Sequence, residues 1–398
     1  MSKESKYPVC HLLYEEYPRD PRVRRYVNAL NETGRKTVII CSKKKNDKYF
    51  EELGGLNRVY RIPVSKKRAS FFITLIEYLA FTSISSVLLI YLGIKYRFKI
   101  IHVHTLPDFL VFAAFWNRIF GAKVILDLHE IFPELYRART GAAENSFKVK
   151  LLKFTEKISI WFSNSAITIH DNARDIFISR NKGIKENIHV VMNSVDPAEF
   201  ENAELIKTNE FIITYNGTVV KLLNLTMIVE ALAELKKKMT AEDFKRVEFR
   251  IYGDGPALDE ILRLAISLGV SNKVNYMGYL QPADMRREVL KTSVLILPPL
   301  KNIYSDLFYT IKLIEAVYLK IPVIATRLNT YRRYYREESL FYFESGNIND
   351  LTAKIEEVFY SKELVHNKTL NALNDYQKLN WEVMREKYLR IVNEIIGF

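Results

Sequence analysis

The stretch of residues 294–326 is the part of this chain that most constrains its fold. It opens with a short apolar run closed by two prolines and ends with a second apolar run, and both are typical of buried strands. Between them, apolar residues recur at steps of three and four positions, which predicts a helix. These residues are Ile311, Ile314, Val317 and Tyr318. A strand, a helix and a second strand form the unit of a parallel sheet, in which ligands bind at the strand ends.

The start of this helix combines a cation with a carboxylate. Lys312 lies in its first turn, and Glu315 follows three residues later on the same face. The first turn also offers free backbone N–H groups and the positive end of the helix dipole, which suit a phosphate. Together with a carboxylate for sugar hydroxyls, these groups predict a site for a nucleoside diphosphate. The alternative is a surface Lys–Glu pair on an ordinary helix.

Strand and helix patterns alternate through the whole chain. Strands are predicted over residues 8–14, 36–41, 99–104, 123–127, 165–169, 188–192, 211–215, 247–252, 273–277, 294–299 and 322–325. Helices are predicted over 21–34, 107–119, 148–162, 221–238, 282–291 and 381–396, a loop over 128–134 and a linker over 193–200. With 398 residues, 48% of them hydrophobic, the chain is expected to form two doubly wound α/β domains.

The balance of charges favours a polyanionic partner. The chain has 59 Lys+Arg against 46 Asp+Glu, a net charge of +13, which suits nucleic acid, an anionic membrane or phosphorylated substrates. The basic residues are spread widely without a nucleic-acid-binding module, which argues against the first. Cys10 and Cys41 lie in apolar, strand-like runs, so a reducing compartment is expected rather than a disulfide framework. Neither zinc-ligand spacing nor a secretory segment is found.

Residues 69–94 form an unusually apolar segment. Its 26 residues include one charge, Glu77, and basic residues flank it on both sides. The length allows a membrane span. However, the strand predicted over 99–104 has to join the same sheet as the earlier strands, and a single span would divide that sheet. One or two helices within 69–97 are therefore predicted, with an apolar side on the sheet or at the membrane interface. The alternative is a fully buried helix pair.

The first predicted helix opens with a cluster of cations. Asp20 is a suitable N-cap, and Pro21 suits the first helical position. Arg22, Arg24 and Arg25 follow in the first turn, where cations oppose the helix dipole. This unfavourable placement indicates anion binding, and a solvated basic face is the alternative.

Other polar or flexible residues follow the predicted strands. Gly217 allows the backbone to approach a ligand closely, and Lys221 offers a second cation for a diphosphate. Gly253 opens a glycine-containing turn that by itself is weak support for a site. His129 comes just after a strand that ends at Asp127. It lies either at the rim of a cleft between the domains, as a substrate contact, or in a loop as a plain hydrogen-bonding residue.

The order of these motifs resembles the retaining glycosyltransferases of family 4. In the second half, the matching residues are Tyr215–Gly217, Lys221, Gly253–Pro256, Gly278, Lys312–Ala316 and Pro322–Thr326. In the first half, they are Pro21–Arg25, Asp127–Glu130 and Asn193–Phe200. The resemblance spans nearly the whole chain, and the order and spacing of the motifs are more specific than any single one.

The resemblance implies the GT-B fold, in which two Rossmann-like domains face each other across a cleft. Residues 1–200 would bind the acceptor, residues 201–375 would bind a nucleotide sugar, and a C-terminal helix within 376–398 would pack back on the first domain. The donor would be UDP- or GDP-linked, with no metal ion and no other cofactor.

The resemblance also assigns site residues. Lys221 and Lys312 would hold the diphosphate, Glu315 would bind the ribose, and His129 would contact the transferring sugar; His129 and the two lysines are the catalytic candidates. The remaining donor candidates are Gly217, Asp306, Thr310 and Ile311. Gly253, Met277 and Tyr279 are candidates for contacts with the base. Arg19, Asp20, Arg22 and Glu130 are candidates for contacts with the acceptor.

Three departures from the family pattern bear on donor binding. Leu307 stands where the family's Glu–seven residues–Glu motif has its first carboxylate, with Asp306 beside it. Leu222–Asn224 replace the usual cation after Lys221, and Pro18–Pro21 replace a glycine-rich turn. Donor binding is therefore expected to be weakened or rearranged.

The expected function is that of a retaining, metal-independent glycosyltransferase in bacterial capsule, O-antigen or exopolysaccharide synthesis. Its acceptor would be lipid-linked or membrane-proximal, and the protein would be cytoplasmic and peripherally bound to the inner face of the membrane. A catalytically silent GT-B binding or assembly subunit is the first alternative. A nucleic-acid-binding protein is the second.

Overall fold

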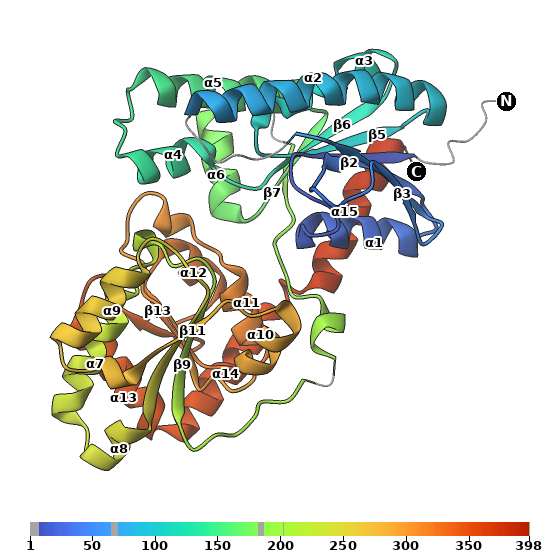
Figure 1. Ribbon diagram of the computed structural model, residues 1–398. Coiled ribbons are helices and arrows are strands. Elements are labelled where there is room, and N and C mark those ends of the chain that lie inside the picture. Colours follow the sequence, from blue (N-terminus) through green and yellow to red (C-terminus); the bar gives the residue numbers. More distant parts are fainter. Residues whose placement is uncertain (1–7, 65–70, 182–186, 202, 398) are drawn as a thin grey trace. The chain divides into compact units, whose positions relative to one another are not determined.

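The computed structural model of the protein describes residues 8–64, 71–181, 187–201 and 203–397 (Figure 1). Lys66, Lys67 and Arg68, the basic residues that precede the apolar segment in the sequence, lie outside the described residues. The chain forms two compact units: unit 1 comprises Met1–Asn193 and Glu382–Phe398, and unit 2 comprises Ser194–Trp381. The chain thus divides after Asn193 and after Trp381, where the sequence analysis expected boundaries at 200 and 375.

Unit 1 is built on an eight-stranded sheet with the order β3-β4-β2-β1-β5-β6-β7-β8. All neighbours are parallel except β3 and β4. The strands are β1 (Val9–Leu13), β2 (Thr37–Ser42), β3 (Phe50–Leu53), β4 (Asn57–Ile62), β5 (Ile100–His104), β6 (Lys123–Leu128), β7 (Ser165–Thr168) and β8 (Ile188–Val190). The sequence analysis missed the hairpin of β3 and β4, because an edge strand with Glu51 and Glu52 lacks an apolar run.

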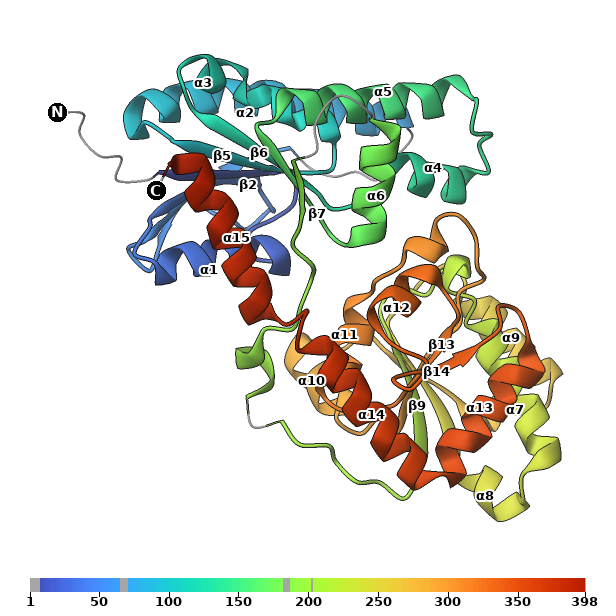
Figure 2. The ribbon, with the colours of Figure 1, turned by 180° about the vertical axis from the view of Figure 1, so that it is seen from behind.

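Helices cover both faces of this sheet (Figures 1 and 2). They are α1 (Pro21–Glu32), α2 (Phe71–Tyr96), η1 (Asp108–Ala114), α3 (Phe115–Ile119), α4 (Phe132–Thr140), α5 (Phe147–Phe162), α6 (Asp171–Arg180) and α15 (Trp381–Ile396). The helix predicted over 107–119 is divided into η1 and α3. The predicted loop over 128–134 is wrong in its last residues, because α4 begins at Phe132 with a proline at its second position.

The ends of α1 and α15 follow the sequence signals. Asp20 caps α1 by accepting hydrogen bonds from the backbone N–H groups of Arg22 and Val23. Helix α15, at the far end of the chain, packs within unit 1 on the side that carries α1 (Figure 2). The rings of Tyr26 and Tyr388 stack there with centroids 4.1 Å apart. The return of the C-terminal helix to the first domain is therefore confirmed.

The apolar segment forms one continuous helix, α2, and not a buried pair. Its inward side consists of Phe81, Ser85, Leu89, Leu92 and Tyr96. Among the described residues, Ile73–Tyr96 is the one helical stretch long and apolar enough to cross a membrane by length and composition, and 17% of its most apolar window is buried. The alternative of a fully buried helix pair is therefore wrong.

Unit 2 contains a parallel six-stranded sheet with the order β11-β10-β9-β12-β13-β14. Its strands are β9 (Phe211–Asn216), β10 (Val247–Tyr252), β11 (Val274–Gly278), β12 (Val294–Leu297), β13 (Val323–Thr326) and β14 (Phe341–Phe343). Alternate residues of β12 join two separate core clusters, so the sheet is buried on both faces. The strand order reverses between β9 and β12, which is where such folds bind ligands.

The helices of unit 2 occupy the connections between these strands. They are η2 (Pro197–Phe200), η3 (Lys221–Leu223), α7 (Thr226–Lys238), α8 (Ala241–Arg246), α9 (Leu258–Ser267), η4 (Ser271–Lys273), α10 (Pro282–Val289), η5 (Ser305–Leu307), α11 (Ile311–Tyr318), α12 (Asn329–Tyr334), α13 (Ile348–Tyr360) and α14 (Lys362–Tyr376). The two Rossmann-like sheets confirm the predicted fold class.

Candidate functional site

A cavity of about 520 Å³ lies at the C-terminal ends of β9 and β10 in unit 2. The helix that follows β12, α11, forms one wall of it. The lining residues are Asn216, Gly217, Thr218, Tyr252, Gly253, Asp254, Tyr279, Leu280, Met285, Ile311, Lys312 and Glu315. The cavity is therefore at the strand-order reversal. Six of the predicted donor and base residues line it: Gly217, Gly253, Tyr279, Ile311, Lys312 and Glu315.

Two glycine turns shape this cavity by packing backbone against backbone. Gly217 and Gly253 both have positive φ angles, 128° and 117°. A Cβ atom on Gly253 would lie 2.2 Å from the carbonyl oxygen of Gly217, so no other residue fits without moving the turn. The backbone N–H of Gly217 donates to the carbonyl of Tyr252 at 2.8 Å. The glycines thus leave room for a ligand beside the strand ends.

Lys312 is a partly buried cation on the cavity wall. Its Nζ lies 5.3 Å from the centroid of the Tyr215 ring, and a Cβ built on Gly217 would be 3.0 Å from it. The described residues give this ammonium no hydrogen bond or ion pair. Burial lowers the pKa of Lys312, and the negative charge of Glu315 partly opposes this shift. A poorly solvated cation without an ion-pair partner is suited to binding an anion, so the alternative of a surface pair with Glu315 does not fit.

The beginning of α11 adds a second source of positive potential. Thr310 is the N-cap, and its Oγ1 accepts a hydrogen bond from the backbone N–H of Leu313 at 3.4 Å. The first helical residues, Ile311 and Lys312, line the cavity. The helix amides and the positive dipole end therefore lie at the same wall as the Lys312 side chain.

Besides Thr310, the N-cap of α11, three of the predicted residues in unit 2 lie outside the cavity wall. The Lys221 ammonium, 78% exposed, pairs with Glu260 at 3.0 Å and is not part of the cavity wall. Asp306 accepts hydrogen bonds from the backbone and the side chain of Asn329, each at 2.6 Å, and so anchors α12. Met277 is exposed and also lies outside the wall.

The sequence analysis missed several wall residues, including Asn216, Thr218, Asp254 and Met285. Asn216 ends β9, and Thr218 and Asp254 lie in the turns after β9 and β10, whose glycines it had noted. Polar residues beside those glycines were therefore the available signal. Met285 lies in α10, and no pattern in the sequence distinguished it from other apolar helix residues.

In unit 1, His129 lies at the edge of a separate cavity of about 680 Å³. The wall includes Glu130 and, from α2, Thr74, Glu77 and Tyr78. The backbone N–H of His129 donates to Oγ1 of Thr105 at 3.1 Å. A partly exposed imidazole in a polar cavity is a candidate for contact with a substrate.

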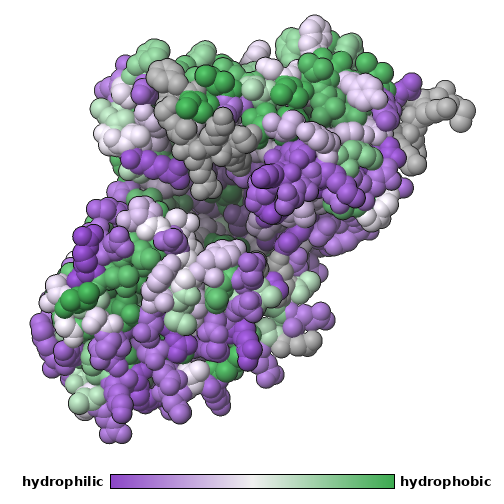
Figure 3. Space-filling model, in the orientation of Figure 1, coloured by the Kyte–Doolittle hydropathy of each residue, from purple (hydrophilic) through white to green (hydrophobic). Residues whose placement is uncertain are grey.

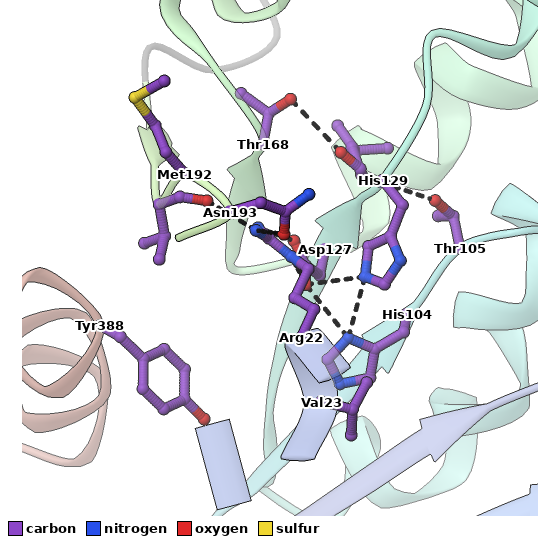
Figure 4. A network of polar contacts seen from close by, with 12 residues as sticks. Arg22, Val23, His104, Thr105, Asp127, His129, Thr168, Met192, Asn193 and Tyr388 are labelled. Atoms are coloured by element: carbon purple, nitrogen blue, oxygen red, sulfur yellow. Dashed lines mark hydrogen bonds and ion pairs between the residues drawn. The ribbon is translucent and has the colours of Figure 1, made fainter. Parts of the chain in front are cut away.

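A buried carboxylate holds the His129 ring (Figure 4). Oδ2 of Asp127 lies 2.9 Å from Nε2 of His129 and 3.1 Å from Nδ1 of His104. Arg22 donates from Nε and Nη2 to the same carboxylate at 2.9 and 2.8 Å. Since a carboxylate only accepts, both histidine nitrogens carry protons, and Nδ1 of His129 is left as an acceptor.

The pKa of Asp127 agrees with this arrangement. Burial alone raises the pKa of the carboxyl, but the Arg22 guanidinium together with His129 and His104 outweighs burial and holds the pKa well below its usual value. Asp127 is therefore a permanent anion in the centre of unit 1.

The network continues into the sheet through further histidines. Nδ1 of His11 lies 3.0 Å from Nε2 of His104, and Nδ1 of His102 lies 3.3 Å from the hydroxyl of Tyr388. Burial lowers the pKa of all three of these histidines, so they are neutral. Because His104 donates its Nδ1–H to Asp127, its Nε2 accepts the proton of His11.

The acceptor candidates in unit 1 mostly have structural partners. Arg22 is buried and paired with Asp127, so its charge is already balanced within unit 1, and its contact with an acceptor stays a prediction. Arg19 is exposed and pairs with Glu16 at 2.8 Å, and Asp20 is the N-cap of α1. Glu130 is the one predicted acceptor residue that lines the cavity beside His129.

Two histidine clusters have the spacing of metal ligands, although the sequence offers no such motif. They are His11 with His102 and His104, and His104 with Asp127 and His129; in each, the ligand atoms lie within 4.8 Å of one another. In the second cluster, the guanidinium of Arg22 already neutralises the carboxylate. That arrangement disfavours a divalent cation beside it.

Comparisons with known proteins agree with this geometry. The family model "Glycosyltransferase Family 4" matches residues 22–199, and the model "Glycosyl transferases group 1" matches residues 196–375. No curated protein matches the sequence.

Solved structures resemble both units together. Sucrose-phosphate synthase from Thermosynechococcus elongatus has a TM-score of 0.75 at 15% identity, covering 98% of this chain and 99% of that chain. WaaG, a glycosyltransferase involved in lipopolysaccharide biosynthesis, has a TM-score of 0.70 at 13% identity, covering 96% and 99%. Anabaena HepE in complex with UDP and glucose has a TM-score of 0.68 at 12% identity, covering 98% and 100%. At these identities the likeness concerns the fold.

Proposed function

Because this chain is a glycosyltransferase of the family-4 type with the GT-B fold, we propose that it moves a sugar from a nucleoside diphosphate donor to a glycan acceptor. The observation that carries this proposal is the Lys312 ammonium at the start of α11, which is partly buried and has no ion-pair partner among the described residues. A diphosphate is the ligand whose charge best matches that wall. The sugar would be a hexose, transferred with retention at its anomeric carbon.

The donor would lie along the wall formed by α11. The α11 amides and Lys312 would bind the diphosphate, and Glu315 would accept hydrogen bonds from the ribose hydroxyls. Tyr279, whose ring is exposed at the cavity edge, would stack on the base. A UDP- or GDP-linked sugar fits this assignment, and the binding of UDP by the structurally similar HepE favours UDP.

The chemistry would be electrostatic in origin. As the bond between the sugar and the diphosphate breaks, negative charge grows on the departing phosphate, and Lys312 and the helix amides stabilise it. These groups supply the positive charge, so the reaction would need no metal ion and no other cofactor. Lys221 would join them only after exchanging Glu260 for a phosphate oxygen.

His129 would serve the transferring sugar. With Nε2–H held by Asp127, its Nδ1 is an acceptor for a sugar hydroxyl. The negative charge of Asp127 would also favour the positive charge that develops on the sugar in an oxocarbenium-like transition state. Glu130, in the same cavity, would contact the acceptor.

The acceptor would be a lipid-linked or membrane-proximal glycan in bacterial capsule, O-antigen or exopolysaccharide synthesis. The exposed apolar side of α2 supports this, since a soluble protein gains nothing from displaying it. The likeness to WaaG, which acts in lipopolysaccharide biosynthesis, points in the same direction. The protein would then be cytoplasmic and peripherally bound to the membrane.

One observation favours a second candidate, a GT-B subunit without activity. Leu307 occupies the position of the family's first carboxylate, and the neighbouring Asp306 is committed to Asn329. A sugar hydroxyl contact is thereby missing. Such a protein would bind a nucleotide sugar or a glycan for assembly and not for transfer.

A panel of UDP-, GDP- and dTDP-sugars distinguishes the two candidates. Thermal shift identifies the donor that binds, and a nucleotide-release assay with membrane extracts as acceptor measures turnover. We expect release of one nucleotide, and Lys312→Ala should lower the rate of that release by about 100-fold. Binding without release by any donor would favour the silent subunit, and the absence of both would contradict the donor site.

A further inference from the structure

Unit 1 contains another cavity, separate from that of His129. It measures about 470 Å³ and lies at the C-terminal end of α2, beside α3 and the last turn of α15. Three cations line it, Arg97, Lys99 and Lys123, and its described lining includes no carboxylate. All three residues are exposed. The cavity therefore has a local charge that attracts anions.

The fold brings these cations together from distant parts of the sequence. Arg97 adopts a left-handed conformation, with φ of 55°, and its backbone N–H donates to the carbonyl of Gly93 at 2.8 Å, which ends α2. Lys99 precedes β5, and Lys123 begins the neighbouring strand β6. The backbone N–H of Lys123 donates to the carbonyl of Lys99 at 2.8 Å. The parallel register of the two strands thus places both lysines at the same end of the sheet, where β5 and β6 begin.

A buried amide adds a hydrogen-bond acceptor to the wall. Nδ2 of Asn117 donates to the carbonyl of Leu89 at 3.0 Å, while its Oδ1 is buried without a partner among the described residues. The side chain fits because residue 93 is glycine, where a Cβ would lie 2.0 Å from Nδ2. A ligand that carries a hydroxyl group would satisfy this oxygen.

The rim of the cavity is apolar and continues into an apolar surface. Ile94, 72% exposed, and Phe120, 74% exposed, border the opening. From Ile94 a row of exposed residues follows the outer side of α2, and Phe120 continues into α3. These exposed residues are Ile73, Ile76, Ile84, Val87, Tyr91, Phe115, Trp116 and Ile119.

Helix α5 carries a second apolar row, which the sequence analysis did not consider. Apolar residues recur on it at steps of four and three, and lysines stand beside them. The row consists of Phe147, Leu151, Phe154, Ile158 and Trp161, and the lysines are Lys148, Lys150, Lys153 and Lys157. An exposed apolar row with aromatic ends and flanking lysines is typical of a helix that lies in a membrane interface.

The two rows belong to one layer of unit 1. Both α2 and α5 pack on η1, and α3 contacts both α2 and η1. Figures 1 and 2 show these helices side by side over the same face of the sheet, and Figure 3 shows apolar residues gathered there. The exposed rows therefore point away from the sheet on a common side.

We propose that this side of unit 1, called here the α2–α3–α5 face, docks on an anionic bilayer. The cavity lined by Arg97, Lys99 and Lys123, called here the Arg97 cavity, binds the headgroup of an anionic phospholipid. The phosphate would contact Arg97, Lys99 and Lys123, a glycerol hydroxyl would donate to Asn117, and the acyl chains would leave past Ile94 and Phe120. The apolar rim favours a lipid over a free phosphate, because acyl chains can pack against it and a phosphate ion cannot. This inference rests on the membrane association proposed above and gives it a site and a lipid class.

Sedimentation with vesicles of phosphatidylcholine, with or without phosphatidylglycerol, tests the site. The cavity variant is Arg97→Gln, Lys99→Gln and Lys123→Gln. The matched control is Lys236→Gln, Lys237→Gln and Lys238→Gln, which removes the same charge from α7 in unit 2. We expect the cavity variant to lose binding to the anionic vesicles by at least about tenfold, while the control loses much less. Binding to neutral vesicles should be equal in both.

Each other outcome overturns a defined part of the inference. Equal losses in the two variants would mean diffuse electrostatics, so the headgroup site would be wrong while membrane association stands. If the wild-type protein binds neither vesicle type, both the headgroup site and the membrane association are wrong. Inorganic phosphate that stabilises the wild type but not the cavity variant, at matched ionic strength, would assign the cavity to a free anion.

A second variant tests the α2–α3–α5 face. Phe154→Ser with Trp161→Ser changes two exposed positions, so it should fold normally and should weaken binding to both vesicle types. Unchanged binding would exclude α5 from the contact. Thermal shift with the nucleotide sugar should be the same in all variants, and this separates a failure of membrane docking from a failure of the donor site.

Discussion

At the scale of single residues, Lys312 is the side chain whose surroundings are most informative. Its ammonium is partly buried, makes no ion pair with any residue that the structure describes, and lies beside the positive end of α11. Among the described residues, the Tyr215 ring and the charge of Glu315 offset the burial of this ammonium only in part, and a bound anion would offset it further. The folded protein therefore keeps an unfavourable charge in place for a ligand.

Lys312→Ala should lower turnover by about 100-fold, the typical loss when one group that stabilises developing negative charge is removed. Folding should be unaffected, because the ammonium makes no hydrogen bond. Steady-state kinetics with the best donor, together with a thermal melt, measures both. Lys245→Ala, at an exposed position of α8, is the control; turnover in Lys312→Ala that equals the control would remove Lys312 from the site.

His129 is the second residue with a defined environment. His129→Ala should reduce transfer more than it reduces nucleotide affinity, because the donor cavity belongs to unit 2 and the imidazole to unit 1. Calorimetry with the nucleotide and a transfer assay give the two quantities. A loss of affinity as large as the loss of rate would mean that His129 binds the nucleotide or only supports the fold.

At the scale of elements, η1 contains a carboxylate in an unusual setting. Asp108 opens η1, which supports both α2 and α5, and it is buried with Oδ1 unpartnered among the described residues. Burial, together with the nearby Glu156, raises the pKa of Asp108 to about 8. Burial also raises the pKa of Glu156 to about 7, although Arg180 opposes this shift. This layer of unit 1 therefore favours protonated carboxyls.

The sign of the pH dependence follows from the raised pKa of Asp108. At pH values between an ordinary carboxyl pKa and about 8, Asp108 is protonated in the folded state and ionised in the unfolded state. Stability should therefore fall as pH rises through this window, by up to about 1.4 kcal/mol per pH unit. Asp108→Asn should flatten the dependence and raise the stability of unit 1 at pH 8.

Urea unfolding at several pH values measures this effect. Tryptophan fluorescence reports mainly on unit 1, since Trp116 and Trp161 lie on α3 and α5. The exposed Asp175→Asn is the control and should leave the pH profile of the wild type unchanged. A profile of Asp108→Asn that also matches the wild type would show that Asp108 ionises normally in the folded protein.

At the scale of the whole molecule, the last helix completes the first unit. Tyr388 of α15 is fully buried, stacks on Tyr26 and lies 3.3 Å from His102 through its hydroxyl. Arg385 pairs with Glu32 at 2.7 Å at the same interface. The core of unit 1 thus needs α15 as well as α1 to be complete.

Tyr388→Ala should destabilise unit 1 by about 3–5 kcal/mol, the usual cost of removing a large buried aromatic side chain. Urea unfolding followed by tryptophan fluorescence measures the change in the free energy of unfolding. Lys387→Ala, the exposed neighbour on α15, should change it little. Equal stability of the two variants would contradict the role of α15 in closing the core.

The sequence by itself determined the features that depend on local periodicity and end signals. The alternation of strands and helices, the Asp20 cap, the bounds of α15 and the placement of Lys312 and Glu315 on α11 could all be predicted. Each depends on residues within a few positions of one another, whose spacing a helix or strand converts directly into a common face. The resemblance added the expected pairing of the two domains.

Only the tertiary structure decided which side chains meet. Arg22 was expected at an acceptor and Lys221 at a diphosphate, yet Arg22 pairs with Asp127 across 105 positions and Lys221 with Glu260. The histidine network and the Arg97 cavity also join residues from separate strands and helices. Their neighbours are set by strand order and register, which the pattern of one segment does not encode, because every strand offers the same two faces to any partner.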